Sequence, residues 1–162
     1  MSLTQSGVPS DAPSLVEGDD FLIQRGNGLQ VVVGLGKSGL SAVRYLCGLG
    51  YQVAVTDGGI PALAQQLPDT VITQFGGLDE ALLARADRII ISPGIDPYLS
   101  VFAAAKAAQV PIVSDIELFH QACLQRQIPI IAITGSNAKS TVTTLVGEMA
   151  KNAGQSMGVG GS

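Results

Sequence analysis

Residues 29–57, LQVVVGLGKSGLSAVRYLCGLGYQVAVTD, contain the pattern that decides the fold. A short apolar run, LQVVV, is followed by the glycine-rich segment GLGKSG, by a helical stretch and by a second apolar run that ends at Asp57. A strand, a glycine turn, a helix and a second strand in this order form a βαβ unit with parallel strands and a right-handed crossover. The stretch therefore predicts an α/β fold with a parallel sheet and flanking helices.

The same alternation continues as far as Ser114. Apolar runs such as TVITQF, DRIIISPG and VPIVS alternate with helical stretches such as LDEALLARA and LSVFAAAKAAQ. Five strands fit, so residues 21–114 are predicted to form one Rossmann-like domain. At its end Ser114 stands three residues before Glu117, which is the spacing of a capping box and predicts a linking helix over residues 115–127.

Residues 128–162 repeat the strand, loop and helix pattern. IPIIAITG predicts a buried strand, GSNAKST a loop, and TVTTLVGEMAKNAG a helix that ends at Gly154. One strand and one helix leave sheet edges and an apolar face uncovered, so we expect the truncated start of a second domain of a longer protein. Alternatively, this piece docks on the first sheet. Residues 1–20, rich in Ser, Pro, Gly and Asp, are expected to be a disordered tail.

The composition narrows the class of protein. Charged residues make up 14% of the chain, the net charge is -4, and the nine Lys and Arg are scattered, which argues against nucleic acid and membrane surfaces as partners. No apolar run approaches the roughly 18 residues of a membrane-spanning helix, and no secretory signal pattern is present. Cys47 and Cys123 stand apart without a CxxC motif and indicate free thiols. We expect a cytoplasmic monomer.

The segment GLGKSG, residues 34–39, has the G-x-G-x-x-G spacing of a nucleotide-binding turn. Glycines let the backbone approach phosphate, the helix start supplies N–H groups, and an acid after the second strand, here Asp57, accepts ribose hydroxyls. By pattern alone this is a dinucleotide site. The alternative is a tight turn whose glycines serve only packing, with Asp57 as a solvated acid.

The segment TGSNAKST, residues 134–141, resembles a phosphate loop between a strand and a helix. Its N–H groups would cradle phosphates, Lys139 would neutralise the terminal ones, and the Ser140 hydroxyl would reach Mg²⁺. A strict Walker A motif fails at Ile133, where glycine is required, and at Ala138, which replaces the glycine before the lysine. By spacing alone, an ATP site and a polar helix cap with a solvated lysine both stay open.

The loop GSNAKST also resembles the ATP loop of the Mur ligases, which have the shorter pattern G-[TS]-N-G-K-[ST]-[TS]. With this pattern the mismatch at Ile133 disappears. VVVGLGKSGLSAVRYL, ISPGI and SDIELF support the resemblance, which extends from Leu29 to Gly161. The chain is most similar to the members that add D-glutamate to UDP-N-acetylmuramoyl-L-alanine in cytoplasmic peptidoglycan synthesis, with ATP and Mg²⁺.

The resemblance implies three domains, of which this chain holds the UDP-binding Rossmann-like domain and the opening of the ATP-binding domain. The implied reaction forms an amide through an acyl phosphate, and the chain alone is expected to be inactive because further catalytic groups lie beyond Ser162. Implied UDP-binding residues are Gly36, Lys37, Ser38, Gly39, Asp57, Gly58, Ser92 and Gly94. Implied ATP-binding residues are Gly135, Ser136, Asn137, Ala138, Lys139, Ser140 and Thr141, with Lys139 catalytic and Ser140 on the metal.

Ala138 replaces the glycine that is usual in the family. We expect a helical φ at this position, where the exchange costs almost nothing, whereas a positive φ would cost about 1 kcal/mol. For the whole chain, a non-catalytic nucleotide-binding or NAD-binding module is the main alternative function. An NAD-dependent oxidoreductase would need a substrate domain with a proton-transfer residue, and none follows in the sequence.

Overall fold

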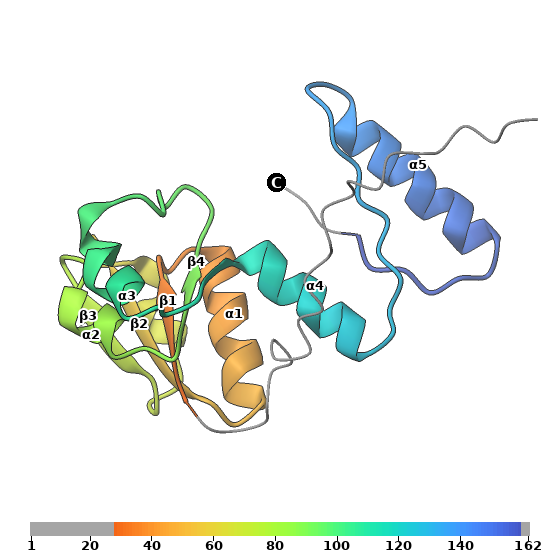
Figure 1. Ribbon diagram of the computed structural model, residues 1–162. Coiled ribbons are helices and arrows are strands. Elements are labelled where there is room, and N and C mark those ends of the chain that lie inside the picture. Colours follow the sequence, from red (N-terminus) through yellow and green to blue (C-terminus); the bar gives the residue numbers. More distant parts are fainter. Residues whose placement is uncertain (1–27, 160–162) are drawn as a thin grey trace, which may run out of the picture. The chain divides into compact units, whose positions relative to one another are not determined.

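The structure is a computed structural model that describes residues 28–159 (Figure 1). The tail predicted over residues 1–20 lies outside the described residues. The chain divides into two compact units, unit 1 (Met1–Leu118) and unit 2 (Phe119–Ser162). Unit 1 holds all the strands of the described part, and unit 2 holds the predicted phosphate loop.

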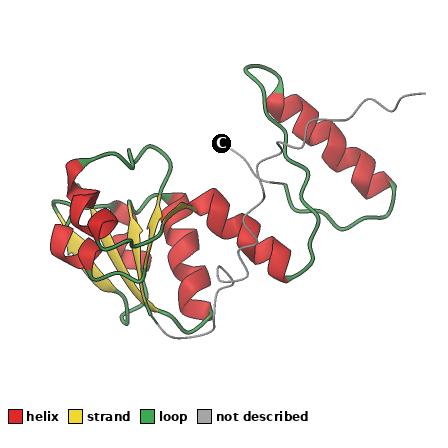
Figure 2. Cartoon of the chain, in the orientation of Figure 1, coloured by secondary structure: helices red, strands yellow, loops and turns green. Residues whose placement is uncertain are grey.

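Unit 1 is built on a five-stranded parallel sheet, drawn in yellow in Figure 2. Its strands are β1 (Leu29–Val33), β2 (Gln52–Asp57), β3 (Ile72–Phe75), β4 (Arg88–Ile91) and β5 (Ile112–Ser114). The strand order is β3-β2-β1-β4-β5. The chain runs outward from β1 to β3 and then crosses to β4, so the direction of winding switches between β1 and β4, where ligands bind in folds of this kind. The five predicted strands and the Rossmann-like fold are confirmed.

Helices cover both faces of the sheet. They are α1 (Lys37–Gly48), η2 (Ala62–Gln66), α2 (Glu80–Ala84), η3 (Ser100–Phe102) and α3 (Ala103–Ala107). Side chains of β1 alternate between the faces, so Val32 packs with α1 in one core, whereas Val31 and Val33 pack with α2 and α3 in the other. The central strand β1 and the middle of β2 are buried and mostly apolar, as expected for a parallel sheet covered on both faces, whereas the edge strand β3 is exposed.

Helix α4 (Asp115–Gln125) follows β5 directly, and the division between the two units falls inside it. The Ser114 hydroxyl oxygen accepts a hydrogen bond of 3.1 Å from the Glu117 N–H, which confirms the predicted helix start. The helix ends two residues before the predicted boundary. Gln127 has a φ of 54°, in the left-handed region, so the chain has left the helical path there.

Unit 2 contains α5 (Lys139–Asn152). Gly154, with a φ of 74°, donates its N–H to the Lys151 carbonyl and ends the helix as predicted. The strand predicted over residues 128–135 is not formed, and Ile131 is 65% exposed. A strand needs a neighbour for its N–H and C=O groups, and no described segment pairs with these residues. None of the helices within residues 28–159 is long and apolar enough to cross a bilayer.

Candidate functional site

The glycine-rich turn of residues 34–39 lies at the carboxyl edge of the sheet, between β1 and α1. Gly34 has a φ of 89° and donates its N–H to the Thr56 carbonyl at 2.9 Å. The Ser92 hydroxyl, which is buried, donates to the Gly34 carbonyl at 2.8 Å. The strands on both sides of β1 therefore hold the start of the turn.

The glycines within the turn have different roles. A Cβ on Gly39 would overlap the Gly34 carbonyl oxygen, so Gly39 allows α1 to pack closely against the turn. At Gly36, by contrast, no atom of the described residues lies within 4 Å of an added Cβ. Gly36 is also the N-cap of the 12-residue α1, and no described side chain caps that helix. The turn is thus open at Gly36, beside the free N–H groups of a helix start.

Asp57 ends β2 and is fixed beside the same turn. One carboxylate oxygen accepts the Leu35 N–H at 2.7 Å, and the other accepts the Gly59 N–H at 2.9 Å. Asp57 is therefore not a solvated loop acid, because it joins the loop after β2 to the glycine turn. A carboxylate has about four lone-pair sites, so two remain for a ligand hydroxyl.

The other residues implied for UDP lie in segments of the same edge. Lys37 is exposed at the first position of α1, and Ser38 beside it is half-buried. Gly58 and Gly94 are exposed in the loops after β2 and β4, and Gly94 has a φ of 90°. The structure links Asp57 and Ser92 to the turn by hydrogen bonds. Lys37, Ser38, Gly58 and Gly94 share the edge by position alone.

Two residues of this edge were missed in the sequence. Ile60 and Tyr98 follow β2 and β4, and each is 85% exposed. No pattern in the sequence marks them, because an apolar side chain in a loop is recognised as exposed only when the fold is known. Their loops follow the strands on both sides of β1.

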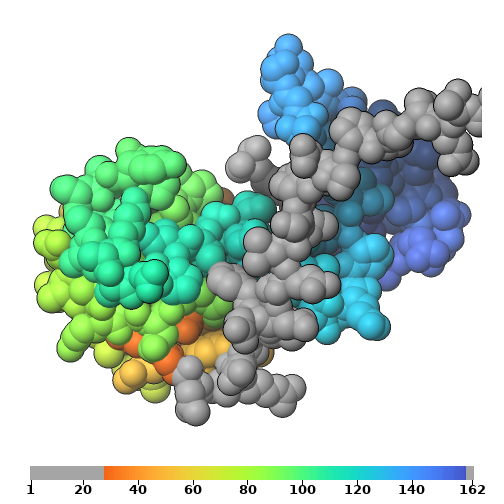
Figure 3. All heavy atoms as spheres, in the orientation of Figure 1, coloured from red at the N-terminus to blue at the C-terminus, as the bar shows by residue number. Residues whose placement is uncertain are grey.

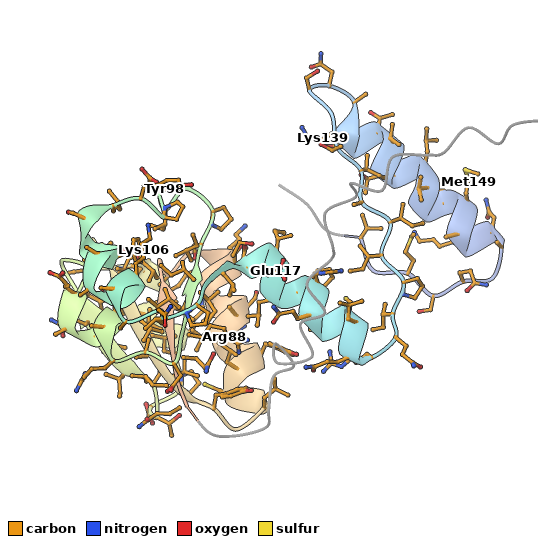
Figure 4. All side chains as sticks on the ribbon, in the orientation of Figure 1. Arg88, Tyr98, Lys106, Glu117, Lys139 and Met149 are labelled. Atoms are coloured by element: carbon orange, nitrogen blue, oxygen red, sulfur yellow. The ribbon has the colours of Figure 1, made fainter. Side chains whose placement is uncertain are left out.

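The predicted phosphate loop precedes α5 in unit 2 and is exposed throughout residues 134–141. Lys139 folds back across the loop and donates from Nζ to the Gly135 carbonyl at 2.7 Å (Figure 4). Ala138 has a φ of 60° and a ψ of 9°, so the helical φ expected there is wrong. The loop has to turn sharply before α5 begins, and this left-handed conformation costs a non-glycine residue about 1 kcal/mol.

The remaining loop residues surround the start of α5. Ser136 and Asn137 are exposed ahead of the helix, and Ser140 and Thr141 are exposed in its first turn. No described side chain caps α5. Within residues 28–159 no group of three or more His, Cys, Asp or Glu side chains could hold a metal. A single hydroxyl, that of Ser140, fits Mg²⁺ only as one ligand among phosphate and water oxygens.

The opposite edge of the sheet holds a buried polar cluster. Arg88 donates from Nε to the Gln30 side chain at 2.7 Å, and its guanidinium lies 6.0 Å from the centre of the Tyr51 ring. Burial lowers the pKa of the Arg88 guanidinium and raises the pKa of the Tyr51 phenol. The cluster joins the starts of β1 and β4, far from the glycine turn. Cys47 and Cys123, among the described residues, are free thiols, as predicted.

Comparison with known proteins gives close relatives in sequence. The family described as Mur ligase MurD-like, N-terminal domain, matches residues 29–114. The UDP-N-acetylmuramoylalanine–D-glutamate ligase of Psychrobacter arcticus is 62% identical over 145 residues, which are 88% of this chain and 30% of that protein. The enzyme of the same name from Acinetobacter baylyi is 54% identical over 143 residues, 88% of this chain and 31% of that protein. The chain thus spans about 30% of the length of the curated relatives it matches.

Two solved structures share the fold. The UDP-N-acetylmuramate-alanine ligase MurC of Thermotoga maritima superposes with a TM-score of 0.51 at 21% identity, over 78% of this chain and 30% of that one. A pseudomurein peptide ligase type C from Methanothermus fervidus gives a TM-score of 0.50 at 23% identity, over 79% and 27%. At this level of identity the likeness concerns the α/β fold alone.

Proposed function

The chain belongs to the MurD-like Mur ligases, and from this premise we propose that unit 1 is the UDP-binding domain of a ligase that adds D-glutamate to UDP-N-acetylmuramoyl-L-alanine. The observation that carries the proposal is the glycine turn that is open at Gly36, beside the uncapped start of α1. A diphosphate fits such a position because backbone N–H groups and the helix dipole both favour an anion.

The neighbouring residues complete the proposed UDP site. Asp57, held by two backbone N–H groups, has lone pairs left for the hydroxyls of the ribose. Lys37 adds a positive charge at the start of α1. Gly39 and Ser92 act inside the turn, where they set the backbone that meets the diphosphate. We also assign Ser38, Gly58 and Gly94 to the nucleotide, because they belong to the loops and the helix start at the same edge of the sheet.

In unit 2 we assign residues 135–141 to ATP. Lys139 would exchange the Gly135 carbonyl for phosphate oxygens and neutralise charge that develops during transfer. The Ser140 hydroxyl would be one ligand of Mg²⁺, and the N–H groups around Gly135, Ser136, Asn137, Ala138 and Thr141 would surround the phosphates. The substrate carboxylate would attack the terminal phosphorus of ATP, so that an acyl phosphate forms and ADP leaves. The amine of D-glutamate then attacks, the amide bond forms and phosphate leaves.

The matched residues are about 30% of the length of the relatives, and we propose that the complete reaction needs groups outside this chain. We therefore expect no phosphate release by this chain alone with ATP, UDP-N-acetylmuramoyl-L-alanine and D-glutamate. The free thiols Cys47 and Cys123 fit the reducing cytoplasm, where we place the reaction.

Calorimetric titration of the chain with UDP and, separately, with NADH tests the assignment of unit 1. We expect binding of UDP and none of NADH. Gly36→Ala fills the open position without touching other atoms, so it should weaken UDP binding while the melting temperature stays unchanged. Binding of NADH without binding of UDP would instead support the NAD-binding module.

A further inference from the structure

The two most exposed large apolar side chains of the described residues are in loops at the carboxyl edge of the sheet. Ile60 and Tyr98 each expose 85% of their surface. Their loops follow β2 and β4, the strands on either side of β1. Single exposed apolar side chains are ordinary on protein surfaces, but these two are in the loops at the end of the sheet where ligands bind in folds of this kind.

Tyr98 is held in a fixed position. Its N–H donates to the Asp96 side chain at 2.8 Å, and Lys106 donates from Nζ to the Pro97 carbonyl at 2.6 Å. The same ammonium group lies 4.9 Å from the centre of the Tyr98 ring, so it covers part of the ring (Figure 4). The loop lies at the surface of unit 1, in green in Figure 3. Because the ring is exposed and already ordered, it would lose little conformational entropy when a ligand packs against it.

The loop that carries Tyr98 is also joined to the glycine turn. Ser92 bonds to the Gly34 carbonyl, and the Ile95 N–H donates to the Ser92 carbonyl at 3.2 Å. These hydrogen bonds fix the start of the loop, as far as Ile95, against the first residue of the turn. A ligand on the turn meets this loop on the β4 side.

The direction of the ligand follows from the strand order. The proposed ribose site is at Asp57, on the β2 side, and the proposed diphosphate site is at Gly36, after β1. Neighbouring strands lie about 4.8 Å apart, so β4 is about 10 Å from β2 across β1. With the ribose at Asp57, a group attached to the far phosphate would extend to the β4 side, where the loop that carries Tyr98 begins.

We propose that Tyr98 is a specificity-determining residue whose ring packs against the sugar ring carried by the diphosphate, while Ile60 contacts the nucleoside. This inference rests on the UDP site proposed above. A pyranose presents C–H groups on its faces, and these pack well on an aromatic ring. Lys106 is a positioning residue, since it holds the ring and the loop but leaves contact with the ligand to Tyr98.

Calorimetry of the chain with two ligands, UDP and UDP-N-acetylmuramoyl-L-alanine, tests the proposal. Tyr98→Ala should lower the affinity for UDP-N-acetylmuramoyl-L-alanine by about 3- to 10-fold and leave the affinity for UDP unchanged, because only the former carries a sugar on its diphosphate. Tyr98→Phe should keep wild-type affinity for both. Ile60→Ala should lower the affinity for both ligands by the same factor. Ile72→Ala, at the start of the edge strand β3, is the matched control and should change neither affinity.

A second readout separates contact from altered folding. In wild type and Tyr98→Phe, NMR resonances of the sugar protons should shift upfield on binding, and in Tyr98→Ala this shift should be lost. Equal weakening of UDP and of the sugar nucleotide by Tyr98→Ala, or no weakening at all, would overturn the inference while UDP binding by the wild type still supports the proposed function. Failure of the wild type to bind UDP would overturn the proposed function and the inference together.

Discussion

Both candidate phosphate-binding loops stand between an apolar run and a helix in the sequence, but the structure around them differs. Residues 34–39 follow β1, which has paired strands on both sides, and hydrogen bonds from Ser92 and to Thr56 fix Gly34 from two directions. Residues 135–141 follow a segment with no strand partner in the described part of the chain, and the Lys139 side chain bonds to Gly135 within the same loop. The same pattern thus forms a strand where neighbouring strands pair with it, and it forms no strand where no described segment does.

Burial follows the same division. Val31, Val32 and Val33 of β1 are 0% exposed, whereas Ile131, in an equally apolar run, is 65% exposed. Burial of apolar surface stabilises a fold by about 25 cal/mol per Å². Burial therefore stabilises β1, whereas the exposed side chain of Ile131 contributes little to stability. Variants of the two loops should therefore differ in how strongly they affect stability.

The largest expected effect is on packing in the first loop. Gly39→Ala places a Cβ against the Gly34 carbonyl oxygen, and we expect a loss of about 3 kcal/mol or more in the free energy of unfolding of unit 1. Gly36→Ala has open space around its Cβ and a φ of -84°, so its stability should stay within about 0.5 kcal/mol of wild type. Urea denaturation of both variants makes the comparison. Equal stability of the two would refute the assigned packing role of Gly39.

The second effect is on the catalytic rate and concerns residues 135–141. It is measured in a full-length ligase that contains this sequence. Lys139→Ala removes the charge aimed at the phosphates and should lower kcat by about 100-fold, roughly 3 kcal/mol. Lys151→Ala is the matched control, because Lys151 is in the last turn of α5 and pairs with Glu148 at 2.9 Å. Its kcat should be unchanged. Steady-state kinetics in which Lys139→Ala keeps both kcat and the KM for ATP would leave the phosphate-loop assignment without support.

A smaller loss of stability is expected when the hydrogen bond between Ser92 and the Gly34 carbonyl is removed. Ser92→Ala leaves the buried Gly34 carbonyl without its hydroxyl partner and should cost about 2 kcal/mol of unfolding free energy. Ser41→Ala, which loses an exposed bond to the Lys37 carbonyl inside α1, should cost less than about 0.5 kcal/mol. Thermal unfolding of both variants is the measurement. A Ser92→Ala variant as stable as Ser41→Ala would show that the sheet holds the turn without this bond.

The smallest expected effect is an increase in the stability of α5. Ala138→Gly relieves the left-handed conformation at φ 60° and should stabilise the start of α5 by about 1 kcal/mol. Ala150→Gly, inside α5, should destabilise the same helix by a similar amount. Hydrogen exchange of the α5 amides reports both changes. Slower exchange in Ala138→Gly agrees with the geometry of the loop, and faster exchange contradicts it.

Much of unit 1 could be predicted from the sequence because local signals and tertiary contacts agree there. The apolar runs, GLGKSG and the Ser114 cap each marked an element that the sheet then stabilised. Residues 128–135 show the opposite case, since an apolar run specifies a strand only together with a partner. At Ala138 the sequence could not reveal the sign of φ, and at Tyr98 it could not reveal exposure, because both depend on how the surrounding chain is placed.

Amide NMR of the ¹⁵N-labelled chain during titration with UDP shows whether unit 1 binds the uridine nucleotide on its glycine turn. We expect the amide resonances of residues 34–39 and 57–59 to shift in proportion to bound UDP, while those of α5 do not shift. Shifts confined to residues 135–141, or no shift with UDP at concentrations where NADH moves residues 34–39, would contradict it.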